Sequence, residues 1–416
     1  MAEKKTAAAL YQERLKRIED AIQLKVPDRV PIFVNFGYLP AKYAGVTCED
    51  AFFDPVKWHE ASKKTVLDFQ PDMYTMAATS PGPILEALGS RQILIPGRGI
   101  SPHHSHQFVE GEYMKADEYD DFLSDPGDYF LRVYSPRVYR KLGALAELNP
   151  LHRMYWSFAE GLPPEMFTTP EFAEAIEAIA NAGRELIKWQ AITAPFGQEM
   201  EALGFPPATG SHAMAPFDLI TDNLRGMRGS MLDMYRQPDK LVASCARILP
   251  WAVERAVAAS RATGNPRVFI PLHRGAEGFM SLKQFEKFYW PTFKGLLLAL
   301  IDHGLTPCPF FEGDYTSRLE YLLELPEGKI MGHFDTTDIF KAKEIIGKHM
   351  CIRGNFPVSL LQTGTVREVK EYTKKLIDVV GKDGGYIMAA RGSLDEANPE
   401  LVKVWMDFTR EYGIYR

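Results

Sequence analysis

The chain has 416 residues, of which 46% are hydrophobic and 25% are charged, and its formal net charge at pH 7 is −6. This composition is typical of a globular enzyme-sized protein, and the absence of a dense Lys/Arg run argues against a nucleic-acid partner. No apolar stretch reaches the ~20 residues that cross a bilayer, and the four cysteines form no CxxC pair, so we expect a cytoplasmic protein that binds no membrane.

The N-terminal segment is rich in Lys and Ala but has helical rather than targeting character. Apolar residues from Leu10 to Ile22 fall near helical spacing, and acidic residues are interspersed among them, which targeting peptides avoid. We predict an N-terminal helix within residues 1–26 that covers the floor or the rim of the domain. Pro27 ends this helix, and the first strand follows at residues 30–36.

A second strand is predicted at residues 72–78 and is followed by an insertion of about 91–125. Alternating residues within this insertion predict a hairpin. The helical patterns after it are long and span residues 172–194 and 236–264. No Gly/Ser linker divides the chain, so we predict a single domain over residues 1–416.

Between Arg267 and Leu394 one short unit is repeated four times. In each copy an apolar run ends in polar residues, and most runs lead into a stretch with helical spacing, such as residues 317–325 or 365–380. The polar ends are Leu272-His273-Arg274-Gly275, Phe311-Glu312-Gly313-Asp314, Gly332-His333-Phe334-Asp335 and Arg353-Gly354-Asn355. Strand, loop and helix repeated with short connections indicate parallel βα units, as in a closed barrel.

Side chains able to do chemistry follow these strands, and in a closed βα barrel the reactive groups sit at the carboxyl ends of the strands. Glu312 and His333 end adjacent strands, so we predict that they are catalytic and bind a metal, with Asp335 as a further ligand and His273 as a catalytic group. A buried glutamate is costly to desolvate unless a cation or a donor faces it. The alternative is a structural pair, in which backbone groups satisfy both side chains.

Substrate-binding residues are predicted in two loops and at one strand end. Asn35, Phe36 and Tyr38 end the first strand, His212 and Asp218 lie in a Gly- and Pro-rich loop, and Asn355 ends the fourth repeated run. The alternative for the His212 loop is packing by its own polar groups, and Arg225 or Arg228 could supply charge for an acidic substrate. Aromatic and soft side chains that could form a slot for a benzene ring are Phe36, Tyr38, Met73, Met76, Trp156, Phe205 and Phe217.

Several other polar residues favour a structural role. The cluster of His103, His104 and His106 is more typical of a solvated or stacked loop than of a metal site. His303 is well placed against a helix C-terminus. Cys308 and Cys351 are more typical of buried, small apolar side chains than of metal ligands. No GxGxxG motif follows a strand, which argues against a nicotinamide enzyme.

Five segments resemble the uroporphyrinogen decarboxylase superfamily, and together they extend over nearly the whole chain. They are Pro27-Asp28-Arg29-Val30-Pro31, Gly37-Tyr38-Leu39-Pro40, Ser281 to Pro291, Gly354-Asn355 and Ala389 to Pro399. The resemblance implies a (β/α)8 TIM barrel, here with an N-terminal helical extension and an inserted hairpin. Members of that superfamily include porphyrin decarboxylases and corrinoid-linked methyltransferases.

The resemblance also implies a branch. Phe33 and Gly37 stand where porphyrin decarboxylases carry arginines for their polycarboxylate substrate, and no cysteine lies near Arg391 as it would in thiolate-zinc methyltransferases. The O-demethylases of methoxylated aromatics have a Glu, fourteen residues, Glu, twenty residues, His motif. Glu312 and His333, with twenty residues between them, match its second half, whereas Leu297 replaces the first glutamate.

This branch implies an O-demethylase that transfers a methyl group from a methoxylated aromatic compound to a corrinoid, with zinc as the metal. The third metal ligand is not assigned, and His273, Asp335 or Glu277 could supply it. The chain has no Asp-x-His-x-x-Gly cobalamin motif, so the corrinoid is expected on a separate corrinoid protein. A homodimer is compatible with these features. The alternatives are a decarboxylase or lyase acting on a small aromatic or tetrapyrrole-like carboxylate, and a non-catalytic scaffold for the corrinoid protein.

Overall fold

The computed structural model describes residues 5–77, 80–149 and 167–415. Within these residues, eight short parallel strands form the centre of the molecule. They are β1 (Phe33–Asn35), β2 (Met73–Thr75), β6 (Ser211–His212), β7 (Arg267–Leu272), β8 (Thr306–Phe311), β9 (Met331–Phe334), β10 (Cys351–Gly354) and β11 (Tyr386–Ile387). Six of them pair in the order β11-β10-β9-β8-β7-β6, and β1 pairs with β2.

Two parallel bridges join these two groups of strands. Ile32 bridges Met388 beside β11, and Tyr74 of β2 bridges Pro207 just before β6. The eight strands therefore follow one another around a closed ring, which is the predicted (β/α)8 barrel.

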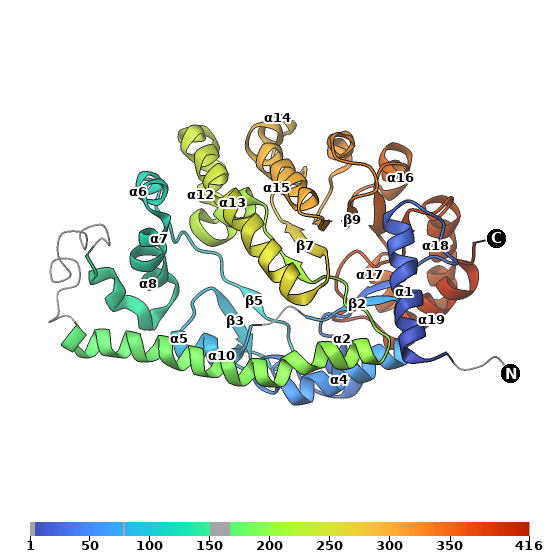
Figure 1. Cartoon of the computed structure of the whole chain (residues 1–416), viewed down its shortest axis with the longest axis horizontal. Helices are drawn as coiled ribbons and strands as arrows, with labels where there is room; N and C mark the ends of the chain where they lie inside the picture. Colours follow the sequence, from blue (N-terminus) through green and yellow to red (C-terminus); the bar gives the residue numbers. More distant parts are fainter. Residues whose placement is uncertain (1–4, 78–79, 150–166, 416) are drawn as a thin grey trace.

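Helices surround this ring, and the longest of them lies along one edge of the molecule (Figure 1). The longer helices are α1 (Ala7–Ile22), α4 (Pro55–Phe69), α10 (Pro170–Ala202), α12 (Gly226–Arg236), α13 (Pro238–Thr263), α15 (Trp290–Asp302), α16 (Ile339–Ile346), α18 (Val366–Val379) and α19 (Pro399–Tyr412). The short α-helices are α2 (Leu39–Ala44), α3 (Asp50–Phe53), α5 (Gly82–Leu88), α6 (Tyr119–Ser124), α7 (Pro126–Tyr129), α8 (Ser135–Val138), α11 (Pro216–Leu219), α14 (Leu282–Gln284) and α17 (Val358–Thr363). The 3₁₀ and π segments are η1 (Phe130–Tyr134), η2 (Arg140–Glu147), η5 (Ile220–Arg225), η6 (Phe285–Tyr289) and η7 (Thr316–Glu324).

Strand alternation divides the core into two layers. On β7, Val268, Ile270 and Leu272 pack in one cluster with side chains of the surrounding helices, such as Ile248 of α13. The intervening residues face the barrel interior, and the next one along, His273, continues this inward set. This alternation brings polar residues just beyond the strands to the open carboxyl end of the barrel, which we call the mouth.

The opposite end, which we call the floor, is closed by apolar side chains. Residues at the amino ends of the strands, including Cys308, Met331 and Cys351, form a buried cluster with Ile18 and Ala21 of α1. The N-terminal helix therefore covers the floor rather than the rim. Burial of this set stabilises the closed end of the barrel through the hydrophobic effect.

The predicted insertion is present and carries one more strand than expected. β3 (Ile93–Pro96) pairs antiparallel with β5 (Gln107–Phe108) and parallel with β4 (Gly99–Ile100). His106, just before β5, packs edge-on against the rings of Tyr38, Phe52 and Phe108, as expected for a stacked loop. The insertion therefore packs against the end of the first barrel strand.

Some predicted elements differ in detail. Residues 317–325, predicted as a helix, lie largely in the 3₁₀ segment η7, whereas α18 forms within residues 365–380 as expected, and it begins at a capping box of Thr365 and Glu368. The first two strands are three residues each, shorter than predicted, and position 78 lies outside the described residues. In the described part of the chain, no helix has both the length and the apolar character required for a membrane span.

Candidate functional site at the barrel mouth

The mouth gathers polar side chains from consecutive strand ends. His273 follows β7, Glu312 follows β8, Asp335 follows β9, Asn355 follows β10 and Arg391 follows β11. The regular register of the parallel strands brings these residues to one end of the barrel. This arrangement is where βα barrels hold their active sites.

His273 contacts two carboxylates at the mouth. Its Nδ1 lies 2.5 Å from Oδ2 of Asp222, and its Nε2 lies 3.8 Å from Oε1 of Glu312. Burial alone lowers the pKa of His273, but the hydrogen bond and charge of Asp222, with the charges of Asp218 and Glu312, outweigh it and raise the pKa to about 9. His273 is therefore an imidazolium at neutral pH.

Asp222 was not among the residues predicted from the sequence. It lies in the π segment η5, away from any strand end, so the strand-end pattern gave no signal for it. The short loop after β6 brings α11 and η5 over the mouth beside β7. A carboxylate on such a turn was detectable only as one of several acidic residues near Asp218.

Asp218 serves a different purpose from the predicted substrate binding. Its carboxylate is fully buried and accepts from the backbone N–H groups of His273 at 3.1 Å and Arg274 at 2.9 Å, and from the hydroxyl of Tyr289 at 2.5 Å. Burial raises its pKa to about 6, although His273 and Tyr289 lower it. Asp218 is thus a positioning residue that fixes the loop carrying His273.

Glu312 faces His273 across a gap wider than a hydrogen bond. Burial raises its pKa, the charge of His273 lowers it, and the nearby carboxylates of Asp218, Asp335 and Asp222 raise it further. Asp335 is held by a 3.0 Å hydrogen bond from the backbone N–H of Gly313, and burial raises its pKa against the effects of that bond and of Arg391. Both carboxyl groups therefore hold a proton more readily than free ones.

His333 lies at a different level of the barrel from Glu312, the residue with which it was predicted to form a catalytic and metal-binding pair. Its ring is stacked on Phe310, its neighbour in register on β8, at 4.4 Å between centroids. Glu312 is two residues beyond Phe310 and so lies one inward position nearer the mouth. The Nε2 of His333 donates to the carbonyl of Ala390 at 2.8 Å, which matches the structural alternative for this residue.

A cation bound at His333 would also meet the positive charge of Arg353. Burial and the neighbouring guanidinium of Arg353 hold the pKa of His333 well below its usual range. Among the described residues, no three His, Cys, Asp or Glu side chains converge closely enough to hold a metal ion. The residues present therefore do not fit the expected zinc site.

The remaining predicted binding residues are partly corrected by their burial. Phe36 is fully buried and packs against Phe69 of α4, outside the barrel. Tyr38 is buried beneath the insertion, where its hydroxyl lies 2.6 Å from Nδ1 of His106. Asn35 is partly buried at the mouth and its Oδ1 accepts from the N–H of Gly37. The exposed His212 ends β6 in register with Phe269.

Asn355 is almost completely buried, and its role is mainly local. Its Nδ2 donates at 2.9 Å to the carbonyls of Asp335 and Thr337, so it orders the loop after β9. Its Oδ1 has no partner in the described part of the chain. This oxygen is therefore a buried acceptor without a partner among the described residues.

The predicted aromatic slot and acidic-substrate charge are not assembled as expected. Met73 belongs to the floor cluster, and Phe205 and Phe217 are buried. Trp156 lies outside the described residues. Arg225 is buried in an ion pair with Asp233. Of the side chains near the mouth, Met76 and Arg391 are partly exposed and could contact a ligand there.

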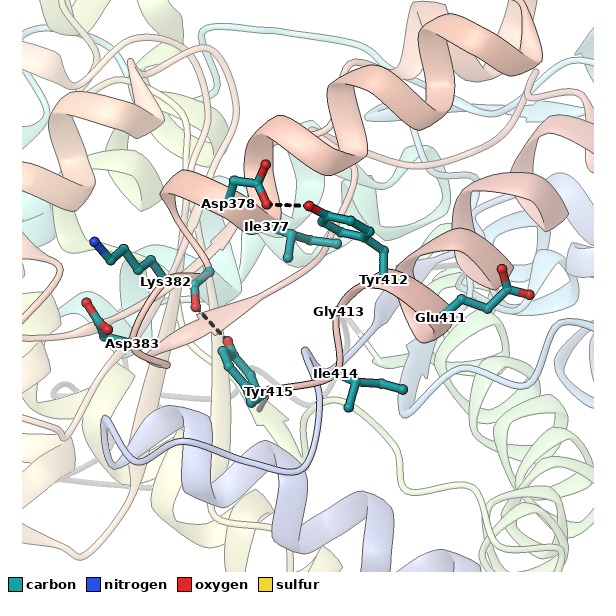
Figure 2. A pocket seen from close by; sticks show the side chains of 10 residues that line it. Ile377, Asp378, Lys382, Asp383, Glu411, Tyr412, Gly413, Ile414 and Tyr415 are labelled. Carbon is teal, nitrogen blue, oxygen red and sulfur yellow. Dashed lines mark hydrogen bonds between the residues drawn. The ribbon is translucent and has the colours of Figure 1, made fainter.

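A surface hollow lies at the other end of the barrel and does not contribute to this site. It measures about 530 Å³ and is lined by the end of α18, the turn before β11 and the C-terminal segment after α19. Figure 2 shows that Tyr412 contacts Asp378. The hydroxyl of Tyr415 donates to the carbonyl of Gly381. Because this turn precedes β11, the hollow is on the floor side, remote from His273.

Comparison with known proteins places the chain among barrel enzymes. The sequence model of uroporphyrinogen decarboxylase (URO-D) matches residues 200–412. A uroporphyrinogen decarboxylase of Syntrophotalea carbinolica is 26% identical over 131 residues, which cover 31% of this chain and 37% of that protein. The chain thus matches little more than a third of this relative's length.

A solved structure has a similar fold over nearly its entire length. The methyltransferase from Methanosarcina mazei superposes with a TM-score of 0.61 at 14% sequence identity, over 98% of this chain and 99% of that chain. At this level of identity, the likeness establishes a shared fold.

Proposed function

The chain belongs to the uroporphyrinogen decarboxylase family, whose sequence model covers just over half of it, and on this premise we propose that it is a methyltransferase. The proposed reaction removes the O-methyl group of a methoxylated aromatic compound and transfers it to a corrinoid carried by a separate protein. The supporting observation is the imidazolium of His273, held by Asp222 and facing Glu312 at the mouth. The shared fold with a methyltransferase adds support.

Cleavage of an aryl methyl ether needs a group that stabilises the leaving oxygen. When the bond between methyl carbon and oxygen breaks, its electron pair stays on oxygen as a phenolate. Phenolic hydroxyls ionise near pH ~10, so an imidazolium with a pKa of about 9 gives its proton to that oxygen favourably. Nε2 of His273 has no hydrogen-bond partner within the described residues, so this N–H is free to point at the ether oxygen.

Neighbouring residues prepare this donor. Asp222 holds Nδ1 and stabilises the charged ring, while Asp218 fixes the backbone on which the ring is carried. Burial raises the pKa of Glu312, and its carboxyl group lies 3.8 Å from Nε2 of His273, on the same side of the mouth as the proposed proton donor. A reduced corrinoid would supply the nucleophile that accepts the methyl group.

Decarboxylation of a porphyrin is less well supported. Phe33, at a position where an arginine is expected in those enzymes, packs in the floor beneath Arg353 rather than at the mouth. At Gly37 a side chain has no room, since a Cβ there would lie 1.9 Å from Oδ1 of Asp395. A polycarboxylate would therefore lack the two guanidinium groups that pair with it.

The test mixes the protein with free cobalamin reduced to the cobalt(I) state and a panel of methoxyphenols and methoxybenzoates. We expect phenol release that requires the corrinoid, together with the absorbance change of its alkylation. Phenol release at the same rate without corrinoid would show a hydrolase, and release of carbon dioxide without demethylation would show a decarboxylase. Either result would overturn the proposal.

A further inference from the structure

Arg353 carries a buried positive charge in the middle of the barrel. It lies on β10 in register with His333 of β9, and only 1% of it is exposed. Its guanidinium lies over the ring of Phe33, at 4.1 Å from the ring centroid, and its Nη1 lies 4.0 Å from Sδ of Met331. A thioether sulfur is a weak acceptor, and Nε has no hydrogen-bond partner within the described residues. The surrounding protein therefore gives this guanidinium little hydrogen bonding.

No carboxylate in the described part of the chain balances this charge. The ionisable groups that act on Arg353 are the thiols of Cys308 and Cys351 and the guanidinium of Arg267. Burial raises the pKa of Cys308 to about 11 and also raises that of Cys351, although the charge of Arg353 lowers both, so the two thiols are uncharged at neutral pH. His333 is neutral as well, because burial and the same guanidinium hold its pKa low. Among the described residues, the interior around Arg353 therefore holds positive charge and no negative charge.

The buried Arg267, at the amino end of β7, differs from Arg353 in its contacts. Its Nε donates to the carbonyl of Ala208 at 2.7 Å and its Nη2 donates to the carbonyl of Pro207 at 2.9 Å. Burial lowers the pKa of Arg353 to about 10, so Arg353 is still charged at neutral pH. A buried charge without a partner is strongly unfavourable, and buried polar groups in native proteins are paired with protein, water or an ion. Arg353 therefore requires a partner that is not a side chain of the described residues.

We propose that the interior of the barrel binds one monovalent anion of the size of chloride on the guanidinium of Arg353. Nε donates to this anion, and the thiol of Cys351, two residues earlier on the same face of β10, is a second, weak donor. A water molecule would accept the hydrogen bond but would leave the charge unbalanced. A larger oxyanion needs many donors, whereas the buried cluster beside Arg353 is formed by apolar and thiol side chains such as Phe33 and Cys308. The site lies one inward position below Asn355, apart from the groups of the proposed reaction.

The first experiment compares thermal unfolding of the full chain in chloride, bromide and gluconate salts of sodium at equal ionic strength. A ligand that binds only the folded state stabilises it, so we expect a melting temperature several degrees higher in either halide than in gluconate. Arg353→Met should abolish this difference, because an apolar chain of similar length needs no counter-charge. The matched control is Arg14→Met, at a buried arginine that donates to the carbonyl of Gly204 and to Gln70, and it should keep the halide dependence. Equal melting temperatures of the wild type in all salts, or loss of the dependence in both variants, would refute the proposal.

The second experiment locates the anion in the wild-type chain and does not depend on the folding of any variant. Protein refolded and crystallised in sodium bromide should show an anomalous scattering peak of bromide inside the barrel, within contact distance of Nε of Arg353. Bromide should remain at this position when the crystals are transferred briefly to gluconate, because the site is buried, whereas bromide on the surface should exchange. A water molecule at Nε, with bromide found only on the surface, would overturn the proposal.

Discussion

The hydrogen bond from Nδ1 of His273 to Asp222 determines the charge at the mouth. Without that carboxylate, burial would favour the neutral ring; with it, the pKa rises to about 9. Asp218 acts on the same residue from the backbone side. Asp222 therefore keeps the imidazole of His273 protonated, whereas Asp218 holds its backbone in place.

Replacement of His273 should abolish most of the activity. We expect His273→Gln to lower kcat by about 10²- to 10⁴-fold, because a glutamine holds the position but cannot donate a proton to the leaving oxygen. The matched control is His104→Gln in the exposed part of the insertion, which should retain activity. Comparable loss in both variants would remove His273 from the mechanism.

The pH dependence should follow the protonated form of His273. Because its folded pKa lies above the ordinary value of 6.5, its stabilising contribution is fully present below pH ~6.5 and is lost as the pH rises through about 9. Activity should fall over the same alkaline range. In Asp222→Asn this alkaline limb should move to lower pH, as a pH profile of kcat/KM would show. An unchanged limb would mean that another group titrates.

At the scale of elements, α1 is tied to the barrel by charge as well as by apolar contact. Asp72, just before β2, is fully buried and accepts from Arg17 of α1 at 2.6 Å and from Arg29 at 2.8 Å. It also accepts from the backbone N–H of Ile32 before β1. One carboxylate therefore joins α1, β1 and β2.

Removal of this carboxylate should destabilise the whole chain. We expect Asp72→Ala to lower the free energy of unfolding by about 3–5 kcal/mol, since two cations lose a buried partner. Lys16→Ala, which breaks the exposed pair with Asp20 on the same helix, should change it by less than ~1 kcal/mol. Chemical denaturation of both variants provides the measurement, and similar midpoints would contradict this account.

Most helices and strands could be predicted from the sequence. The positions of the inward-facing side chains along the barrel axis could not. The polar residues after β7 to β10 indicated the ends of parallel strands, and the helical spacing of residues 365–380 predicted α18. However, spacing along the chain cannot show that His333 pairs in register with Phe310 or that its Nε2 donates to the carbonyl of Ala390. Both contacts depend on how the strands pair. Asp222 lies in the π segment η5, and no periodic sequence pattern predicts that segment.

At the scale of the whole molecule, the ring closure separates the barrel interior into levels. The floor is apolar, the middle holds His333 against Arg353, and the mouth holds the acidic groups around His273. A cation is therefore disfavoured in the middle, where a guanidinium already lies.

Chelation should consequently leave the protein intact. We expect dialysis against a strong chelator to change neither the melting temperature nor the corrinoid-dependent demethylation, because Glu312 and His333 lie at different levels. Elemental analysis before and after dialysis supplies the control. Loss of a near-stoichiometric metal in parallel with activity, repeated by Glu312→Gln, would restore the metal hypothesis.

Within the described residues, Ile18, Ala21 and their neighbours close the floor, so the mouth is the open end of the barrel. If the aromatic compound and the methyl acceptor both use it, they must arrive in sequence, the small molecule first and the bulky protein second. The phenol can depart only after the acceptor has withdrawn. Turnover should then show ordered kinetics, and an excess of acceptor protein should slow it by trapping product inside.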